Sequence, residues 1–177
     1  MYTIEQIDCM TEGEREAALS QKAKKFITNL NNALKDQSIE AFGKNSSGLW
    51  GDSKDTLSFK IKNVSLQSDY VDIYEGKASL NINISLVGYD DSKDYGMLYT
   101  DSKSEKSIND LIISLLGKGA KAGWSEQGLQ GDKYINFDLS VPAKMVAPDF
   151  LIYNEYQDKI KLLKEKANSK ISSIKMK

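Results

Sequence analysis

Histidine is absent from this chain of 177 residues. Its absence excludes Ser-His-Asp and Cys-His catalysis, zinc sites built on imidazole, and pH switching by a histidine. One cysteine, Cys9, cannot form an internal disulfide, which favours the reducing cytoplasm of a cell or of a host cell. Carboxylate, lysine and tyrosine chemistry remain open, but no motif selects residues for it. We therefore expect neither enzymatic activity nor a cofactor.

Long hydrophobic runs are also absent: no apolar stretch approaches the roughly 18 residues that a membrane-spanning helix needs. The N-terminus, MYTIEQIDCMTEGERE, is acidic and lacks the basic start and apolar centre of a secretion signal. We expect no membrane insertion. Hydrophobic residues make up 40% of the chain and charged residues 28%, so a single folded domain over 1–177 is expected rather than a disordered chain.

The most regular stretch present is KASLNINISLVGY, from Lys77 to Tyr89. Apolar and small polar residues alternate in it, which predicts a long strand with one dry face. The dry positions are Ala78, Leu80, Ile82, Ile84 and Leu86. Alternation from about Thr56 and over Ile135–Val141 predicts further strands.

Local signals predict how these strands are interrupted. The alternation after Thr56 changes parity at Val64, which predicts a bulge or bend near Asn63. Glu75-Gly76 predicts a hairpin turn between a short strand, Tyr70–Tyr74, and the long one. The stretch Gly43–Gly48, GKNSSG, predicts a loop.

Two amphipathic stretches predict the first helices. A capping box at Thr11 precedes a stripe that predicts a helix over about 12–35. An S-x-x-D signature at Ser107 predicts the start of a short buried helix that ends at Gly117. Together with the strands, this order predicts an α+β fold, an antiparallel sheet of about 4–6 strands with long N-terminal and C-terminal helices and one short buried helix.

The C-terminal helix is the most suggestive feature. Pro148 opens it, and it runs over about 149–175, about 38 Å if 25 residues are helical, which is longer than a small sheet needs for cover. Residues 159–177 hold seven lysines and one acid, a net charge of +6, so in a chain of net charge −1 the remainder carries −7. We expect an acidic body with a basic helix able to project from it.

A narrow apolar stripe runs along this helix at spacings of three and four. We expect a protein partner or a second copy to dock on this stripe. The residues of the stripe are Tyr153, Tyr156, Ile160, Leu163, Ala167, Ile171 and Ile174. The leading hypothesis is therefore a non-catalytic binding module, of adaptor or inhibitor type. A two-helix seam would look similar, although one extra step of four breaks a strict heptad.

Nucleic-acid binding is the alternative, because lysine gives diffuse attraction to phosphates and exposed aromatic rings can stack on bases. The residues that would serve it are Lys161, Lys164, Lys166, Lys170, Trp124 and Lys121. The sequence pI of about 5.6 argues against it, and a solvated helix face would also explain the lysines.

Two other patterns are weaker indications of a binding site. Lys118 and Lys121 lie in a glycine-rich stretch, but it follows a helix and precedes a strand, the reverse of a phosphate-binding loop. Four acids cluster without the spacing of a calcium loop, so no metal is expected there; they are Asp90, Asp91, Asp94 and Asp101. The composition, rich in lysine, asparagine and isoleucine, resembles that of small accessory proteins of AT-rich bacteria or their phages.

Overall fold

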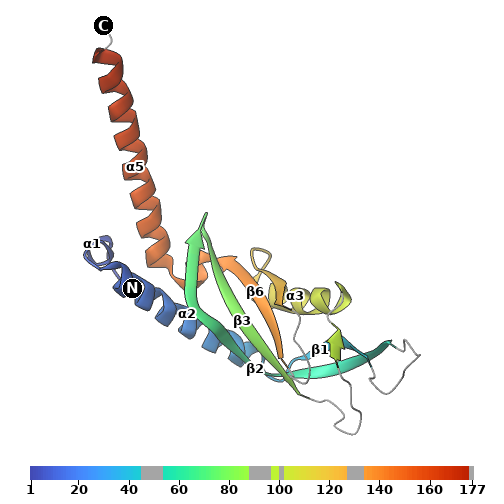
Figure 1. Ribbon diagram of the computed structural model, residues 1–177. Coiled ribbons are helices and arrows are strands. Elements are labelled where there is room, and N and C mark those ends of the chain that lie inside the picture. The colour runs from blue at the N-terminus through green and yellow to red at the C-terminus, as the bar shows by residue number, and fades with distance from the viewer. Residues whose placement is uncertain (45–53, 88–96, 100–101, 127–133, 176–177) are drawn as a thin grey trace.

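The structure is a computed structural model, and it describes residues 1–44, 54–87, 97–99, 102–126 and 134–175 (Figure 1). In chain order the elements are α1 (Ile4–Asp8), α2 (Glu12–Leu34), β1 (Ser38–Lys44), β2 (Lys54–Tyr74), β3 (Lys77–Val87), β4 (Met97–Tyr99), α3 (Ser102–Leu116), β5 (Lys121–Glu126), β6 (Tyr134–Pro142), α4 (Ala143–Val146) and α5 (Pro148–Lys175). Six strands form one sheet in the order β4-β1-β2-β3-β6-β5, and every described pair is antiparallel. The predicted α+β fold is confirmed.

The core lies on one face of the sheet. Ile82 and Ile84 on β3 are fully buried, as the alternation of the long strand predicts. α2 packs along β2 and contributes Ile27 and Leu34 to the same core, while α3 contributes Ile112. The dry face of the long strand is thus covered by helices that precede and follow it in the chain (Figure 1).

The other face of the sheet carries polar rungs between neighbouring strands. Asn83 Nδ2 donates to Asn136 Oδ1 at 3.0 Å, and Asn81 Nδ2 donates to Asp138 Oδ1 at 3.1 Å. Both pairs are direct partners in the register of β3 and β6. Such cross-strand pairs fix the register of a sheet from the side opposite its core.

β2 is bent by two irregularities in its pairing with β3. The predicted bulge is confirmed, since the register shifts between Ile61 and Asn63. A larger bulge follows, in which residues 67–70 lie opposite Asn81 alone. The predicted hairpin turn is also confirmed: Glu75 and Gly76 have positive φ, 48° and 75°, as a two-residue turn with the right-handed twist of a hairpin requires.

The helix boundaries partly follow the predictions. Thr11 forms the expected capping box, in which its Oγ1 accepts from Glu14 N and Glu14 Oε2 accepts from Thr11 N. Gly117 ends α3 with φ of 86°, and its N–H donates to the Ile113 carbonyl. The predicted start of α3 at Ser107 is wrong, because the helix begins at Ser102 and Ser107 lies inside it. A hydroxyl residue marks a cap only where the chain before it is not helical.

Several elements have no counterpart in the predictions, among them the short strand β4. α1 is one short turn and α4 another, each stabilised by what it packs against rather than by its own length. β1 extends to Lys44, so the first two residues of the loop predicted at Gly43–Gly48 belong to a strand. Residues 45–48 lie outside the described part of the chain, as do the aspartates at 90, 91, 94 and 101.

Candidate functional site

The first turn of α5 is fixed to the body through Asp149. Its Oδ2 accepts from Tyr2 N and from Lys22 Nζ, each at 2.8 Å, and its Oδ1 accepts from Phe150 N. Burial by itself would raise the pKa of Asp149, but the hydrogen bonds from Lys22, Tyr2 and Phe150 outweigh it, so the pKa is lowered. Asp149 is therefore a buried carboxylate that joins the N-terminus, α2 and α5.

The next two turns of α5 are fixed to α1. Tyr153 Oη and Gln157 Nε2 both donate to Asp8 Oδ1 at 3.1 Å. The Arg15 guanidinium lies 5.3 Å from the centre of the Tyr153 ring and its Nε donates to the Ile7 carbonyl. Tyr153, one of the residues predicted to bind a partner, is only 7% exposed and serves this internal junction.

Beyond the junction α5 extends away from the body (Figure 1). Every residue from Lys161 to Ile171 is exposed. The exposed fraction of Leu163 is 66%, of Ile171 52% and of Tyr156 44%. Of the other predicted docking residues, Ile160 is half-buried and Ala167 is exposed, while Ile174 lies on α5 with its side chain outside the described part. We call Tyr156, Ile160, Leu163, Ala167 and Ile171 the exposed stripe.

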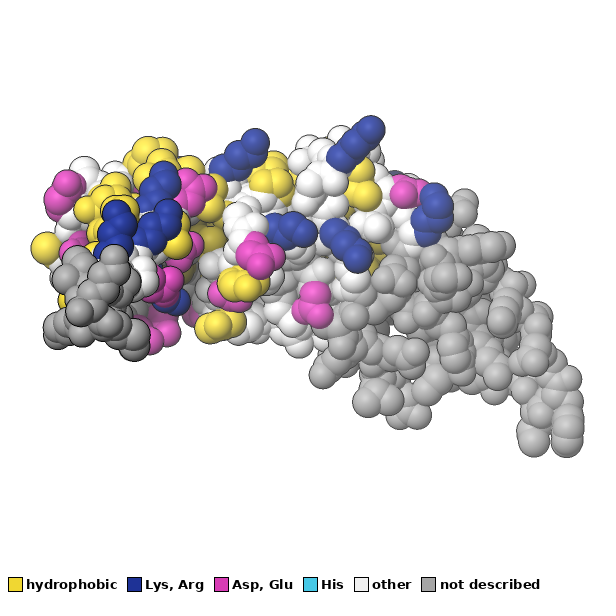
Figure 2. Space-filling model, turned by 90° about the horizontal axis from the view of Figure 1, so that it is seen from above, with side chains coloured by type: hydrophobic (Ala, Val, Ile, Leu, Met, Phe, Trp, Pro, Cys, Tyr) yellow, Lys and Arg dark blue, Asp and Glu magenta, His cyan; other side chains and the backbone are white. Residues whose placement is uncertain are grey.

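The lysines predicted for nucleic acid fall on two elements. Those at 161, 164, 166 and 170 are exposed on the projecting part of α5. Seen from above, basic side chains stand beside hydrophobic ones around the end of this helix (Figure 2). Lys121 is exposed on β5, where Trp124 also lies with its side chain outside the described part. Lys118 is exposed between α3 and β5.

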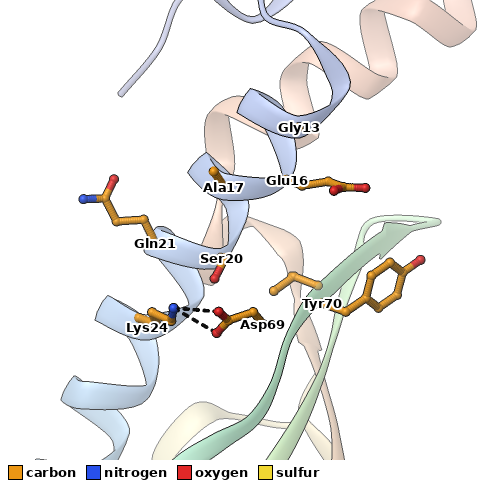
Figure 3. A pocket seen from close by; sticks show the side chains of 9 residues that line it. Gly13, Glu16, Ala17, Ser20, Gln21, Lys24, Asp69 and Tyr70 are labelled. Carbon is orange, nitrogen blue, oxygen red and sulfur yellow. Dashed lines mark hydrogen bonds and ion pairs between the residues drawn. The ribbon is translucent and has the colours of Figure 1, made fainter.

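A groove that the sequence did not predict is present beside α2. It lies between α2 and β2 and has a volume of about 570 Å³ (Figure 3). Gly13, Ala17 and Ser20 line it from the helix, and Val71 lines it from the strand. These three helix residues recur at spacings of four and three, so the sequence does carry a signal: a face of small side chains on an otherwise bulky helix.

Comparisons with protein-family models, with curated proteins and with solved structures found no match to this chain. Among the described residues, no group of three or more Cys, Asp or Glu is arranged to hold a metal ion. No helix in the same ranges is long and apolar enough to cross a membrane. Two surfaces of the described residues are therefore the candidates for function: the exposed stripe of α5 and the groove beside α2.

Proposed function

We propose that this protein is a non-catalytic binding module that docks a protein partner, in the simplest case a second copy, through the exposed stripe of α5. The observation that carries the proposal is the unbroken exposure from Lys161 to Ile171, which includes two large apolar side chains of the stripe. Burying each of them would contribute roughly 1.5–3 kcal/mol. The single cysteine favours the cytoplasm of a cell or host cell as the place where it acts.

The stability of the projecting part of α5 also supports a partner that covers the exposed stripe. Isolated helices shorter than about 12–15 residues are marginal in water, because packing of an apolar face supplies most of helical stability. Every residue of the segment from Lys161 to Ile171 is exposed, so this segment buries no apolar face against the described part of the body. A partner that covers the stripe would stabilise the helix as well as bury its apolar side chains.

The test compares the solution mass of four chains by light scattering over a range of concentrations. They are the full chain, a truncation ending at Lys159, and the variants Leu163→Gln and Leu162→Gln. Leu162 is a matched control, because it is 50% exposed but lies outside the stripe. We expect the full chain to self-associate, the truncation to be a soluble monomer, and Leu163→Gln to weaken association about tenfold more than Leu162→Gln.

Equal effects of the two leucine variants, or a truncation that associates as the full chain does, would contradict docking through the stripe. Loss of solubility on truncation would make the projecting helix part of the core and would also contradict it. Monomers at every concentration would exclude self-association and leave a different protein or a nucleic acid as the partner.

Nucleic-acid binding is the second candidate, favoured by the exposed lysines of α5 at 161, 164, 166 and 170. Against it, Glu155 and Asp158 precede them on the same helix and line a groove of about 660 Å³ with Glu75. Phosphates would be repelled there. Fluorescence anisotropy with labelled single-stranded and duplex nucleic acid decides between the candidates: binding that weakens steeply with salt supports this one, and no binding at low salt excludes it.

A further inference from the structure

The second half of β2 has a free edge. β1 pairs with β2 only as far as Lys60, and over 61–74 the only strand beside β2 in the described ranges is β3. α2 covers the first part of this edge: Asn31 Oδ1 accepts a hydrogen bond from Val64 N at 2.7 Å. A helix that satisfies edge groups in this way protects a strand from pairing with another chain.

Past the larger bulge this protection ends. In a two-residue hairpin the residues that flank the turn, here Tyr74 and Lys77, form a hydrogen-bonded pair. The main-chain N–H and C=O of Tyr74 therefore both point toward β3. Main-chain groups alternate in direction along a strand, so those of Val71 and Ile73 point away from β3. No strand or capping side chain meets them among the described residues. Two residues with donors and acceptors therefore remain available for pairing.

The groove between α2 and β2 opens at this point, with Val71 in its wall. Its helix side includes the small residues Gly13, Ala17 and Ser20, which leave room for another chain beside the longer side chains of Glu16, Gln21 and Lys24 (Figure 3). Ser20 provides an independent observation: the residue is 8% exposed, and its Oγ is buried with no hydrogen-bond partner within the described ranges. Buried hydroxyls are nearly always hydrogen-bonded, so this oxygen suits a polar group that enters the groove.

The charge of the groove indicates which kind of side chain it would bind. Asp69 is paired with Lys24, whose Nζ lies 2.9 Å from its Oδ1 (Figure 3). Glu16 on the helix side takes part in none of the ion pairs of the described residues. The unpaired charge at the groove is therefore negative, which favours a basic side chain.

From these observations we propose that the groove binds an extended peptide segment, which adds as a short strand to the edge of β2 at Val71 and Ile73. Main-chain hydrogen bonds to this edge supply affinity, and alternate side chains of the peptide enter the groove. A lysine or arginine of the peptide lies near Glu16, and the Ser20 hydroxyl bonds the entering chain. This site is separate from the exposed stripe of α5, and the inference does not depend on the function proposed for that helix.

The test starts from a phage-displayed library of random linear peptides, selected on the full chain and counter-selected on an Ala17→Phe variant. Ala17→Phe fills the groove with an aromatic side chain, whereas Ala33→Phe makes the same change at another exposed position of α2 outside the groove. We expect enriched peptides to carry a basic residue. By fluorescence anisotropy, synthetic versions should bind Ala17→Phe at least about tenfold more weakly than the full chain and should bind Ala33→Phe as well as the full chain.

Two further measurements test the mode of binding. Glu16→Gln should weaken binding about threefold and reduce its salt dependence, because it removes the charge that the basic residue meets. Methylating the peptide nitrogens one at a time should abolish binding at alternate positions only, since only every second N–H bonds to the neighbouring strand. No enrichment over the Ala17→Phe chain, equal binding to both phenylalanine variants, or a methylation pattern without alternation would each overturn the proposal.

Discussion

At the scale of single residues, Asp149 holds together parts of the chain that are far apart in sequence. It accepts hydrogen bonds from Tyr2 and Lys22, and its side chain is only 1% exposed. A buried carboxylate is stable only where donors surround it, because the loss of hydration must be offset by hydrogen bonds and charge. Here three donors do so, and the lowered pKa of Asp149 is the measurable sign that they do.

Asp149→Asn should therefore lower the free energy of unfolding by about 2 kcal/mol at pH 7, since hydrogen bonds to charged groups are worth roughly 1.5–3 kcal/mol. The pKa of Asp149 is lowered by folding, so its contribution is present above the unfolded pKa, about 3.9, and is lost as the pH falls through the folded value. Urea unfolding from pH 7 to pH 3 measures this. The exposed Asp72→Asn is the control, and a difference between wild type and Asp149→Asn that does not shrink as the pH falls would contradict the assignment.

At the scale of elements, β2 shows how a local irregularity determines which main-chain groups of a strand are free to pair with another chain. Its larger bulge and its turn together set which main-chain groups of Val71 and Ile73 face outward. The turn contains one strained residue, because Glu75 has φ of 48° although it carries a side chain. A non-glycine residue in this region costs of order 1 kcal/mol.

Replacing Glu75 by asparagine should relieve part of that strain and raise the free energy of unfolding by about 0.5–1 kcal/mol, because Asn-Gly is the preferred sequence for this turn. Gly76→Ala should lower it by about 1 kcal/mol. A Cβ at Gly76 would meet nothing within 4 Å, so the second change isolates the cost of positive φ from any clash. Urea unfolding with an unchanged m-value measures both; effects of the same sign would contradict the turn geometry.

At the scale of the whole molecule, α5 divides into a part that belongs to the body and a part that does not. Phe150 and Tyr153 are buried, while every residue from Lys161 to Ile171 is exposed. The charge divides at nearly the same place, since the lysines gather after the helix has left an acidic body. The projecting half therefore differs from the body in burial and in charge together, as expected of a surface that meets a partner.

Hydrogen exchange followed by mass spectrometry should resolve these two halves. At low protein concentration, amides from Phe150 to Gln157 should exchange slowly, whereas those from Lys161 to Ile171 should exchange quickly, because unpacked helix opens at little free-energy cost. At concentrations where the chain self-associates, the second group should become protected. Equal protection of both halves in dilute solution would contradict the division, and a Leu163→Gln chain that gains the same protection would contradict the stripe as its cause.

The sequence predicts features whose causes are local and fails where the cause is remote. The turn at Glu75 and the capping box at Thr11 are correct because each depends on a few adjacent residues. The start of α3 is wrong because a capping signature inside a helix looks like one at its end. Tyr153 and Leu163 lie on the same stripe of α5 by sequence spacing. Tyr153 is buried because α1 packs against it, whereas Leu163 is exposed, and the sequence does not show this difference.

The sequence by itself determined the long helices, the central strands, the dry face of the long strand and the polarity of charge, because these follow from the order of neighbouring residues. The tertiary structure alone decided where α5 leaves the body and where α2 leaves the edge of β2 uncovered. Both depend on contacts across long separations, such as that of Tyr2 with Asp149, which lie 147 residues apart. Periodicity along a chain carries no information about which distant residues are in contact. The candidate sites of this protein lie where α5 and α2 no longer cover, or are covered by, the rest of the body.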